Sequence, residues 1–324
     1  KEYIVWKSPI NFGGKGLWMS MSEREQIPEP TKRQVRQEAG FGCAKCGIPI
    51  ISYNHIVPYV ETHDNSPDNI IPLCPNHHRL YHAGQYSRET LRRMKAHPHN
   101  VEHVSHRFSF ESPQLVMKAG TNTYIDTPII LEIDGEQLLS MRMEDGLIFI
   151  NALFFSPDNQ ELVSIVDNEW RLKVEDVWDV EYSLGRDITR LTIRLEPRNI
   201  LVQLELARSE IRLRAEMYYN GVRYSIRDSG TYINDQFNIA QVTNSTFERC
   251  ARAFSHSTGP PGRDLPVLSS TTMSTIFREI DGSLLNISLR YKIRKLKNPD
   301  GSWKRRPDGS QEYFIHIQPA IEKI

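Results

Sequence analysis

The chain has 324 residues, enough for two domains, and its hydrophobic (39%) and charged (25%) fractions are those of a folded protein. Lys and Arg number 40, as do Asp and Glu, so no net charge draws the whole molecule to nucleic acid. The longest nearly apolar run, residues 147–155, is too short to span a bilayer, and four cysteines are too few for a disulfide scaffold. We therefore expect a cytoplasmic protein without a membrane segment.

Charge and histidine are distributed unevenly along the chain. Residues 1–120 contain 15 Lys and Arg against 11 Asp and Glu, whereas the remaining residues contain 25 against 29. Nine of the eleven histidines fall within the first 106 residues, where three of the four cysteines also lie. Such a concentration of metal-binding residue types predicts that the chemistry resides in the N-terminal part. We expect two domains, residues 1–118 and residues 119–324.

Two helices are predicted in the N-terminal domain. Residues 31–39 follow a proline-containing segment and end at Gly40, a residue type that commonly terminates helices. Residues 87–96 begin at Ser87, a plausible N-cap, and are followed by Pro98.

From about Thr121 the pattern becomes that of β-strands separated by turn residues. The turn pairs that begin at Asp134, Asp158, Asn220 and Asp281 each lead into an alternating strand, which is typical of β-hairpins. Ordinary hairpin repetition explains this recurrence better than internal duplication does. The clearest predicted strands are residues 128–133, 147–155, 161–166, 189–195, 200–206 and 210–214. The predicted fold class is α+β: a small metal-containing domain followed by a larger all-β domain, either a sandwich or a hairpin-rich fold.

A CxxC and a CxxH motif frame the middle of the N-terminal domain. Cys43 and Cys46 form the first, and Cys74 and His77 form the second. Each motif places two ligands on one tight turn, so the two together can surround one tetrahedral Zn²⁺. A redox pair or two buried thiols would explain the CxxC motif alone, but the second motif favours structural zinc.

The segments around these motifs resemble the HNH endonuclease family. "GFGCAKCG" at 40–47, "NHIVP" at 54–58 and "DNIIPLCPNHH" at 68–78 supply its residues in the order His55, Asn69, His78. The resemblance covers residues 31–98, about a fifth of the chain, and implies a zinc-braced ββα-metal fold. It also implies metal-dependent hydrolysis of phosphodiester bonds, which needs a base for water and a cation for the charge on phosphate. The remainder of the chain resembles no family that we can name.

The resemblance implies a role for each inner residue. His55 is the general base, which suits an imidazole because its ordinary pKa lies near neutrality. Asn69 holds the hairpin that carries it, and His78 turns from the zinc toward a catalytic Mg²⁺, Mn²⁺ or Ni²⁺. Asn54 stands where many HNH enzymes have a metal-binding aspartate, and an amide is a weaker ligand than a carboxylate. His82, one helical turn after His78, is either a further ligand or an ordinary exposed or packed histidine.

The DNA-binding surface is less clearly marked. Candidates are the basic residues beside the predicted site and the segment Lys304, Arg305 and Arg306, although solvated charged faces would look the same. The candidates beside the site are Arg88, Arg92, Arg93 and Lys95.

The leading functional hypothesis is a metal-dependent HNH endonuclease that cuts DNA, with RNA not excluded. By analogy with bacterial proteins of similar layout, we expect a role in restriction or anti-phage defence. One alternative is a catalytically silent zinc module that binds nucleic acid or protein. Another is the nuclease subunit of a two-component defence complex. The β-rich domain would then recognise a target or partner, or form a homodimer.

Overall fold

The computed structural model describes residues 26–234, 239–249, 252–256, 272–278, 284–295 and 313–323. The predicted turn at Asp281 and the basic segment Lys304–Arg306 lie outside these ranges. Among the helices that the structure describes, none has the length and apolar character that a membrane span requires.

The N-terminal region contains four short helices and a two-stranded hairpin. The predicted helices at 31–39 and 87–96 are confirmed as α1 and α4, and the Ser87 hydroxyl caps α4 by accepting the Thr90 N–H at 3.1 Å. The elements are α1 (Glu29–Glu38), β1 (Ser52–His55), α2 (Tyr59–Thr62), a 3₁₀ turn (Pro67–Asn69), β2 (Ile70–Leu73), α3 (Pro75–His82) and α4 (Arg88–Ala96).

A seven-stranded sheet begins the β-rich region. It includes the strands predicted at 128–133, 147–155 and 161–166, which are confirmed as β6, β8 and β9. In sheet order the strands are β19 (Arg252–His256), β6 (Ile129–Ile133), β7 (Glu136–Glu144), β8 (Leu147–Phe155), β9 (Glu161–Val166), β10 (Glu169–Lys173) and β3 (His103–Arg107).

A ten-stranded sheet forms the rest of the main β-region. The strands predicted at 189–195, 200–206 and 210–214 are confirmed as β12, β13 and β14, and β14 continues five residues further than predicted. The main path runs through β11 (Asp179–Leu184), β12 (Ile188–Glu196), β13 (Asn199–Ala207), β14 (Glu210–Tyr219), β15 (Val222–Arg227), β16 (Gly230–Asn234) and β17 (Ile239–Val242). Three strands pair off this path: β4 (Val116–Ala119), β5 (Asn122–Ile125) and β18 (Thr246–Glu248).

Two residue pairs explain why the hairpins could be predicted. Asp134–Gly135 and Asn220–Gly221 both have positive φ at each residue, between 48° and 84°. Turns of this kind match the right-handed twist of the strands they join and favour Asp or Asn followed by Gly. They connect β6 to β7 and β14 to β15, so these two turn predictions are confirmed.

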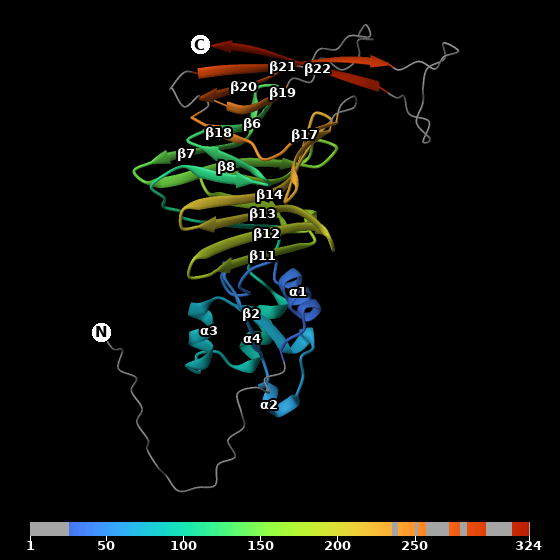
Figure 1. Cartoon of the computed structure of the whole chain (residues 1–324). Coiled ribbons are helices and arrows are strands. Elements are labelled where there is room, and N and C mark those ends of the chain that lie inside the picture. The colour runs from blue at the N-terminus through green and yellow to red at the C-terminus, as the bar shows by residue number, and fades with distance from the viewer. Residues whose placement is uncertain are drawn as a thin grey trace.

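The chain packs around two separate apolar cores. The larger core contains buried side chains from both main sheets, such as Phe154 and Leu204, and includes Phe41 from the N-terminal region. The smaller core lies within the N-terminal region and contains Ile56 and Leu91. Figure 1 shows the helices at one end beside β11, and the sheet of β20 (Thr272–Arg278), β21 (Leu284–Lys295) and β22 (Tyr313–Lys323) at the other. The predicted fold class is confirmed: a small α/β region with a Cys/His cluster precedes a large β-rich region of two sheets.

One strand of the β-rich region precedes the predicted domain boundary. β3 pairs along its whole length with β10, from His103 opposite Lys173 to Arg107 opposite Glu169. Val104 is buried in the larger core, whereas its neighbours on either side are exposed. The boundary between residues 118 and 119 stays a prediction, and this pairing argues for a more N-terminal one.

Candidate metal centre and nuclease site

A hairpin and a helix position the predicted site. β1 and β2 pair antiparallel, with His55 opposite Ile70, and α3 follows β2 after one residue. The Tyr81 hydroxyl on α3 donates to the His55 carbonyl oxygen at 3.3 Å, which ties the helix to the end of β1. Every residue of β2 is buried, so the hairpin forms the centre of this region and the helix lies against it.

The structure brings the four predicted zinc ligands together. The Sγ atoms of Cys43, Cys46 and Cys74 and a ring nitrogen of His77 all lie within 4.8 Å of one another. The His77 Nδ1 atom is 3.4 Å from Cys43 Sγ and 3.2 Å from Cys74 Sγ, and the Cys46 and Cys74 sulfurs are 3.8 Å apart. In a tetrahedral zinc site with bonds of about 2.1–2.3 Å, ligand atoms lie roughly 3.5–3.8 Å apart. Three thiols and an imidazole at this spacing suit structural Zn²⁺.

The protonation chemistry of the cluster also suits a metal ion. Burial raises the pKa of the Cys46 thiol to about 12, so without a cation that thiol keeps its proton at neutral pH. Metal binding releases such protons, because the thiolate is the ligand. Burial, and then the charge of Lys45, lower the pKa of His77, which favours the neutral imidazole that coordinates metals. A bound cation would therefore offset the cost of burying this group of side chains.

A buried asparagine outside both motifs braces the first one. Gly47 closes the CxxC turn with φ of 76°, and its N–H donates to the Cys43 carbonyl at 2.8 Å. The Asn100 Nδ2 atom, contributed from beyond α4, donates to the carbonyl oxygens of Gly40 and Gly47 at 3.0 and 2.9 Å. No local sequence pattern marks Asn100, because its contacts are to residues more than fifty positions earlier.

His55 and Asn69 lie at adjoining positions of the hairpin. The Asn69 Oδ1 atom accepts the Val57 N–H at 2.8 Å, and its Nδ2 atom donates to the carbonyls of Val57 and Asp64 at 3.0 and 3.1 Å. His55 Nε2 lies 2.9 Å from Asn65 Oδ1. Asn65, which no sequence pattern marked, therefore orients the His55 imidazole. Asn69 fixes the loop that joins β1 to β2.

The two histidines of α3 point at each other. The Nε2 atoms of His78 and His82 are 2.7 Å apart, and the ring centroids are 4.5 Å apart. Burial, and then the proximity of His82, lower the pKa of His78, which favours its neutral imidazole. Two imidazole nitrogens this close can share a proton or occupy neighbouring positions around one cation.

Asn54 faces the other side of its strand. Side chains alternate along a strand, so Asn54 points away from the side of β1 that His55 and Tyr53 share. It is buried, and its Nδ2 atom donates to the Ser52 carbonyl at 3.1 Å. Among the described residues, no hydrogen bond joins it to His78 or His82, so its part in metal binding stays a prediction.

The predicted basic residues divide into two groups. Arg88 donates to both carboxylate oxygens of Glu61 at 2.8 and 2.9 Å, and Lys95 pairs with Glu38. Arg92 and Arg93 are exposed and form no ion pair within the part of the chain that the structure describes. Of the four predicted basic residues, these two are therefore the ones without an ion pair, and the segment 304–306 lies outside the described residues.

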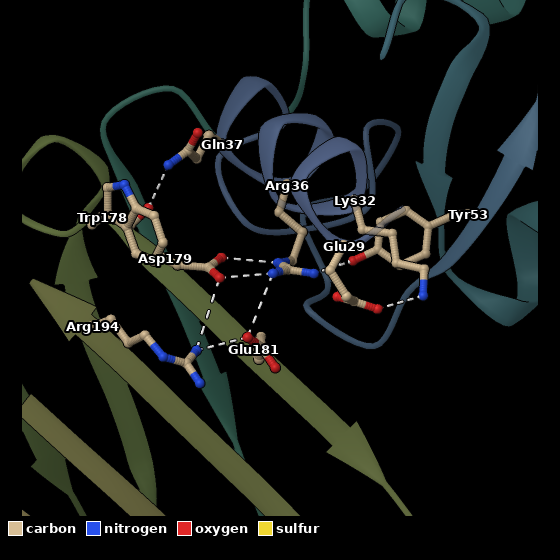
Figure 2. A network of polar contacts seen from close by, with 9 residues as sticks. All are labelled: Glu29, Lys32, Arg36, Gln37, Tyr53, Trp178, Asp179, Glu181 and Arg194. Carbon is tan, nitrogen blue, oxygen red and sulfur yellow. Dashed lines mark hydrogen bonds and ion pairs between the residues drawn. The ribbon is translucent and has the colours of Figure 1, made fainter. Parts of the chain in front are cut away.

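A buried charge network joins the N-terminal region to the ten-stranded sheet. Arg36 of α1 donates from Nε and Nη2 to both oxygens of Asp179 on β11, at 2.9 and 2.7 Å. Figure 2 shows the same guanidinium reaching Tyr53 of β1, and Gln37 bonded to the Trp178 carbonyl. The sequence gives no sign of this network, because 143 residues separate Arg36 from Asp179.

Comparison with known proteins agrees with the geometry of this region. Residues 43–87 match a protein-family model described as HNH endonuclease, and the rest of the chain is unassigned. The matched segment includes all four cluster residues together with the β1–β2 hairpin and α3. No curated protein and no solved structure gives a significant match to the chain.

Proposed function

We propose that this chain, whose residues 43–87 are an HNH endonuclease domain, is a metal-dependent enzyme that hydrolyses phosphodiester bonds of DNA. The observation that carries the proposal is that β1 holds an oriented imidazole, His55, while α3, which is hydrogen-bonded to the end of β1, carries the close pair His78 and His82. A zinc module that only binds would have no need of either arrangement. The cluster at Cys43 supplies the structural brace.

The hydrogen bond to Asn65 assigns the proton on the His55 ring. An amide oxygen can only accept, so the Nε2 atom that lies 2.9 Å from Asn65 Oδ1 carries the hydrogen. The Nδ1 atom then has the free lone pair and takes the proton from the attacking water, as a general base does. Asn69, by holding Val57, keeps the strand end in place while the proton moves.

The residues that would hold a catalytic cation are His78 and His82, with Asn54 as a third candidate. A divalent cation bound there would offset the charge that develops on the phosphate as the bond breaks. Imidazole ligands suit Zn²⁺, Ni²⁺ and other transition metals better than Mg²⁺, and the absence of a carboxylate from this set strengthens that preference. We expect Mn²⁺ or Ni²⁺ to support more activity than Mg²⁺.

Among the basic residues predicted beside the site, two are available for substrate binding. Arg92 and Arg93 are free to neutralise phosphates, whereas Arg88 and Lys95 would have to leave their carboxylate partners. We extend the proposal to restriction or anti-phage defence in the cytoplasm by analogy alone. In that setting the β-rich region would contact a second copy of the chain or a companion protein. A nuclease subunit of a two-component complex is one form of this proposal.

The test is cleavage by the purified full-length chain. Plasmid DNA, phage DNA with and without modified bases, and single-stranded RNA are incubated with Mg²⁺, Mn²⁺ or Ni²⁺. His55→Ala should lower the rate by about 10²–10⁴-fold, the usual contribution of a general base, and should retain the zinc content. If the wild type cleaves none of these substrates with any cation, the silent zinc module is the better interpretation. Full activity in His55→Ala would show that another residue is the base.

A further inference from the structure

Arg36 is a single side chain that joins its own helix to two other elements. Its Nε and Nη2 atoms bind both oxygens of Asp179 on β11, and its Nη1 atom donates to the Tyr53 hydroxyl on β1 at 2.6 Å. Arg36 itself lies on α1, so the helix, the catalytic hairpin and the edge of the ten-stranded sheet meet at one guanidinium (Figure 2). Arg36 is 6% exposed and Asp179 is 1% exposed, so solvent does not compete for the bonds between these two residues.

The strand geometry connects this contact to the proposed base. Tyr53 and His55 are two residues apart on β1, so their side chains emerge on the same side of the strand. A guanidinium is planar and presents its N–H groups in a fixed fork, so movement of Asp179 relative to Tyr53 would break at least one bond. Burial raises the pKa of the Tyr53 hydroxyl, so it stays a neutral acceptor for Arg36 at physiological pH.

Neighbouring contacts hold the Asp179 carboxylate in place. Arg194 on β12 donates to Glu181 at 2.6 Å and lies 3.9 Å from Asp179, and Glu181 is 3.5 Å from Arg36. The Arg33 guanidinium stacks 4.2 Å from the Trp178 ring, one residue before Asp179. The edge of the ten-stranded sheet therefore holds α1 through several specific contacts.

We propose that Arg36 is a positioning residue for the nuclease: through Tyr53 it holds β1, and with it His55, in a fixed relation to the β-rich region. The catalytic part of this inference rests on the proposed function, but the hold on β1 does not. The β-rich region would then belong to the scaffold of the active site, in addition to any role in recognition.

Tyr53→Phe tests the inference most sharply. It removes the one hydroxyl that links Arg36 to β1 while it leaves the Arg36–Asp179 pair and the aromatic ring in place. We expect hydrogen exchange of the peptide that contains β1 to become about tenfold faster, as loss of one hydrogen bond to a charged group predicts. The matched control is Tyr232→Phe, whose hydroxyl bonds Ser229 at 3.0 Å on the exposed part of the β-region, and which should leave β1 exchange unchanged.

Kinetics supply a second readout in the full-length, zinc-loaded protein. Misplacing His55 affects the chemical step more than binding, so kcat should fall about tenfold in Tyr53→Phe while KM changes less than about twofold. Arg36→Lys should behave similarly, because one ammonium cannot replace the planar fork that reaches both Asp179 and Tyr53. The double variant should be little slower than either single one, since both changes remove the same link.

The results of these experiments distinguish a failure of the positioning role of Arg36 from a failure of the proposed nuclease function. Unchanged β1 exchange and unchanged kcat in Tyr53→Phe would overturn the positioning role. Additive losses in the double variant would also overturn it, because the two residues would then act independently. If the wild type cleaves no nucleic acid, the proposed nuclease is wrong, and β1 exchange alone decides whether Arg36 holds the strand.

Discussion

Asn69 shows why an asparagine, rather than an aspartate, stands between the two histidines of the motif. Its side-chain oxygen accepts one N–H and its side-chain nitrogen donates to two carbonyl oxygens, so donor and acceptor capacity are both used. A carboxylate has the same shape but cannot donate, and it would face two carbonyl oxygens in a buried position. The sequence predicted that Asn69 holds the hairpin, and the three bonds give a physical account of how it could.

At the same scale, zinc should be required for the folding of the N-terminal region. We expect one tightly bound Zn²⁺ per chain, and Cys74→Ser should lose it and unfold residues 26–100, because buried thiols without a metal stabilise little. Elemental analysis and circular dichroism of the variant would measure both effects. The β-rich region should stay folded, since its core is separate. Fully folded wild-type protein without zinc would contradict the prediction.

The two histidines of α3 should differ from His55 in their response to added metal. His78→Ala removes one of two nitrogens that lie 2.7 Å apart, so its main effect should be weaker cation binding. We expect activity to fall about 10–100-fold at low Mn²⁺ and to recover in part as Mn²⁺ is raised. His55→Ala should show no such recovery. Equal losses at all metal concentrations in His78→Ala would argue against ligation.

At the scale of elements, local patterns predicted α1, α4 and several of the hairpins, but not α2 or α3. The Ser87 cap, the Asp–Gly and Asn–Gly turns and the alternating strands are all determined by neighbouring residues, so sequence analysis could find them. β3 was missed because its apolar alternation is weak: Val104 is the one strongly apolar residue in 103–107.

For the candidate site too, residues with local contacts could be predicted from the sequence, whereas residues with distant contacts could not. The zinc ligands come in two local pairs, and the distance between the pairs is short because β1 and β2 are a hairpin, which the family resemblance implied. Asn100 and Arg36 act across the fold, and Asn65 acts across the loop that joins β1 to β2. Their partners could be found only from the three-dimensional arrangement, because polar residues of these types are common at the surface.

Asn100 offers a test of how the first zinc-binding turn is supported. Asn100→Ala leaves the carbonyl oxygens of Gly40 and Gly47 without this donor in a buried setting, which should cost about 2–3 kcal/mol. We expect urea-induced release of zinc to occur at a lower denaturant concentration. The control is Asn159→Ala, an exposed residue bonded to Asn220, which should leave zinc release unchanged. Identical release curves for the two variants would remove Asn100 from the support of the metal centre.

For the whole molecule, the uneven distribution of charge along the sequence corresponds to different parts of the structure. Residues 26–100, which form the helices and the hairpin at one end, contain nine Lys and Arg against six Asp and Glu, whereas residues 101–324 contain 27 against 31. DNA would therefore approach the end that bears His55, and the negatively charged β-region would disfavour non-specific contact along the rest of the molecule. Specific recognition would then depend on local features, since bulk charge does not supply it.

The final prediction concerns where the molecule can be divided. A cut between residues 118 and 119 removes β3 from β10 and interrupts β4, and it separates Val104, Phe108 and Met117 from the larger core. An unpaired β10 edge would promote aggregation, so 119–324 should be poorly soluble, whereas 101–324 should stay soluble and cooperative in unfolding. Residues 1–100 should keep zinc but show faster hydrogen exchange in β1, because Asp179 no longer holds Arg36. Size-exclusion chromatography, calorimetry and exchange measurements compare the fragments. If 119–324 unfolds at the same temperature as 101–324, β3 does not belong to the folding unit of the β-region.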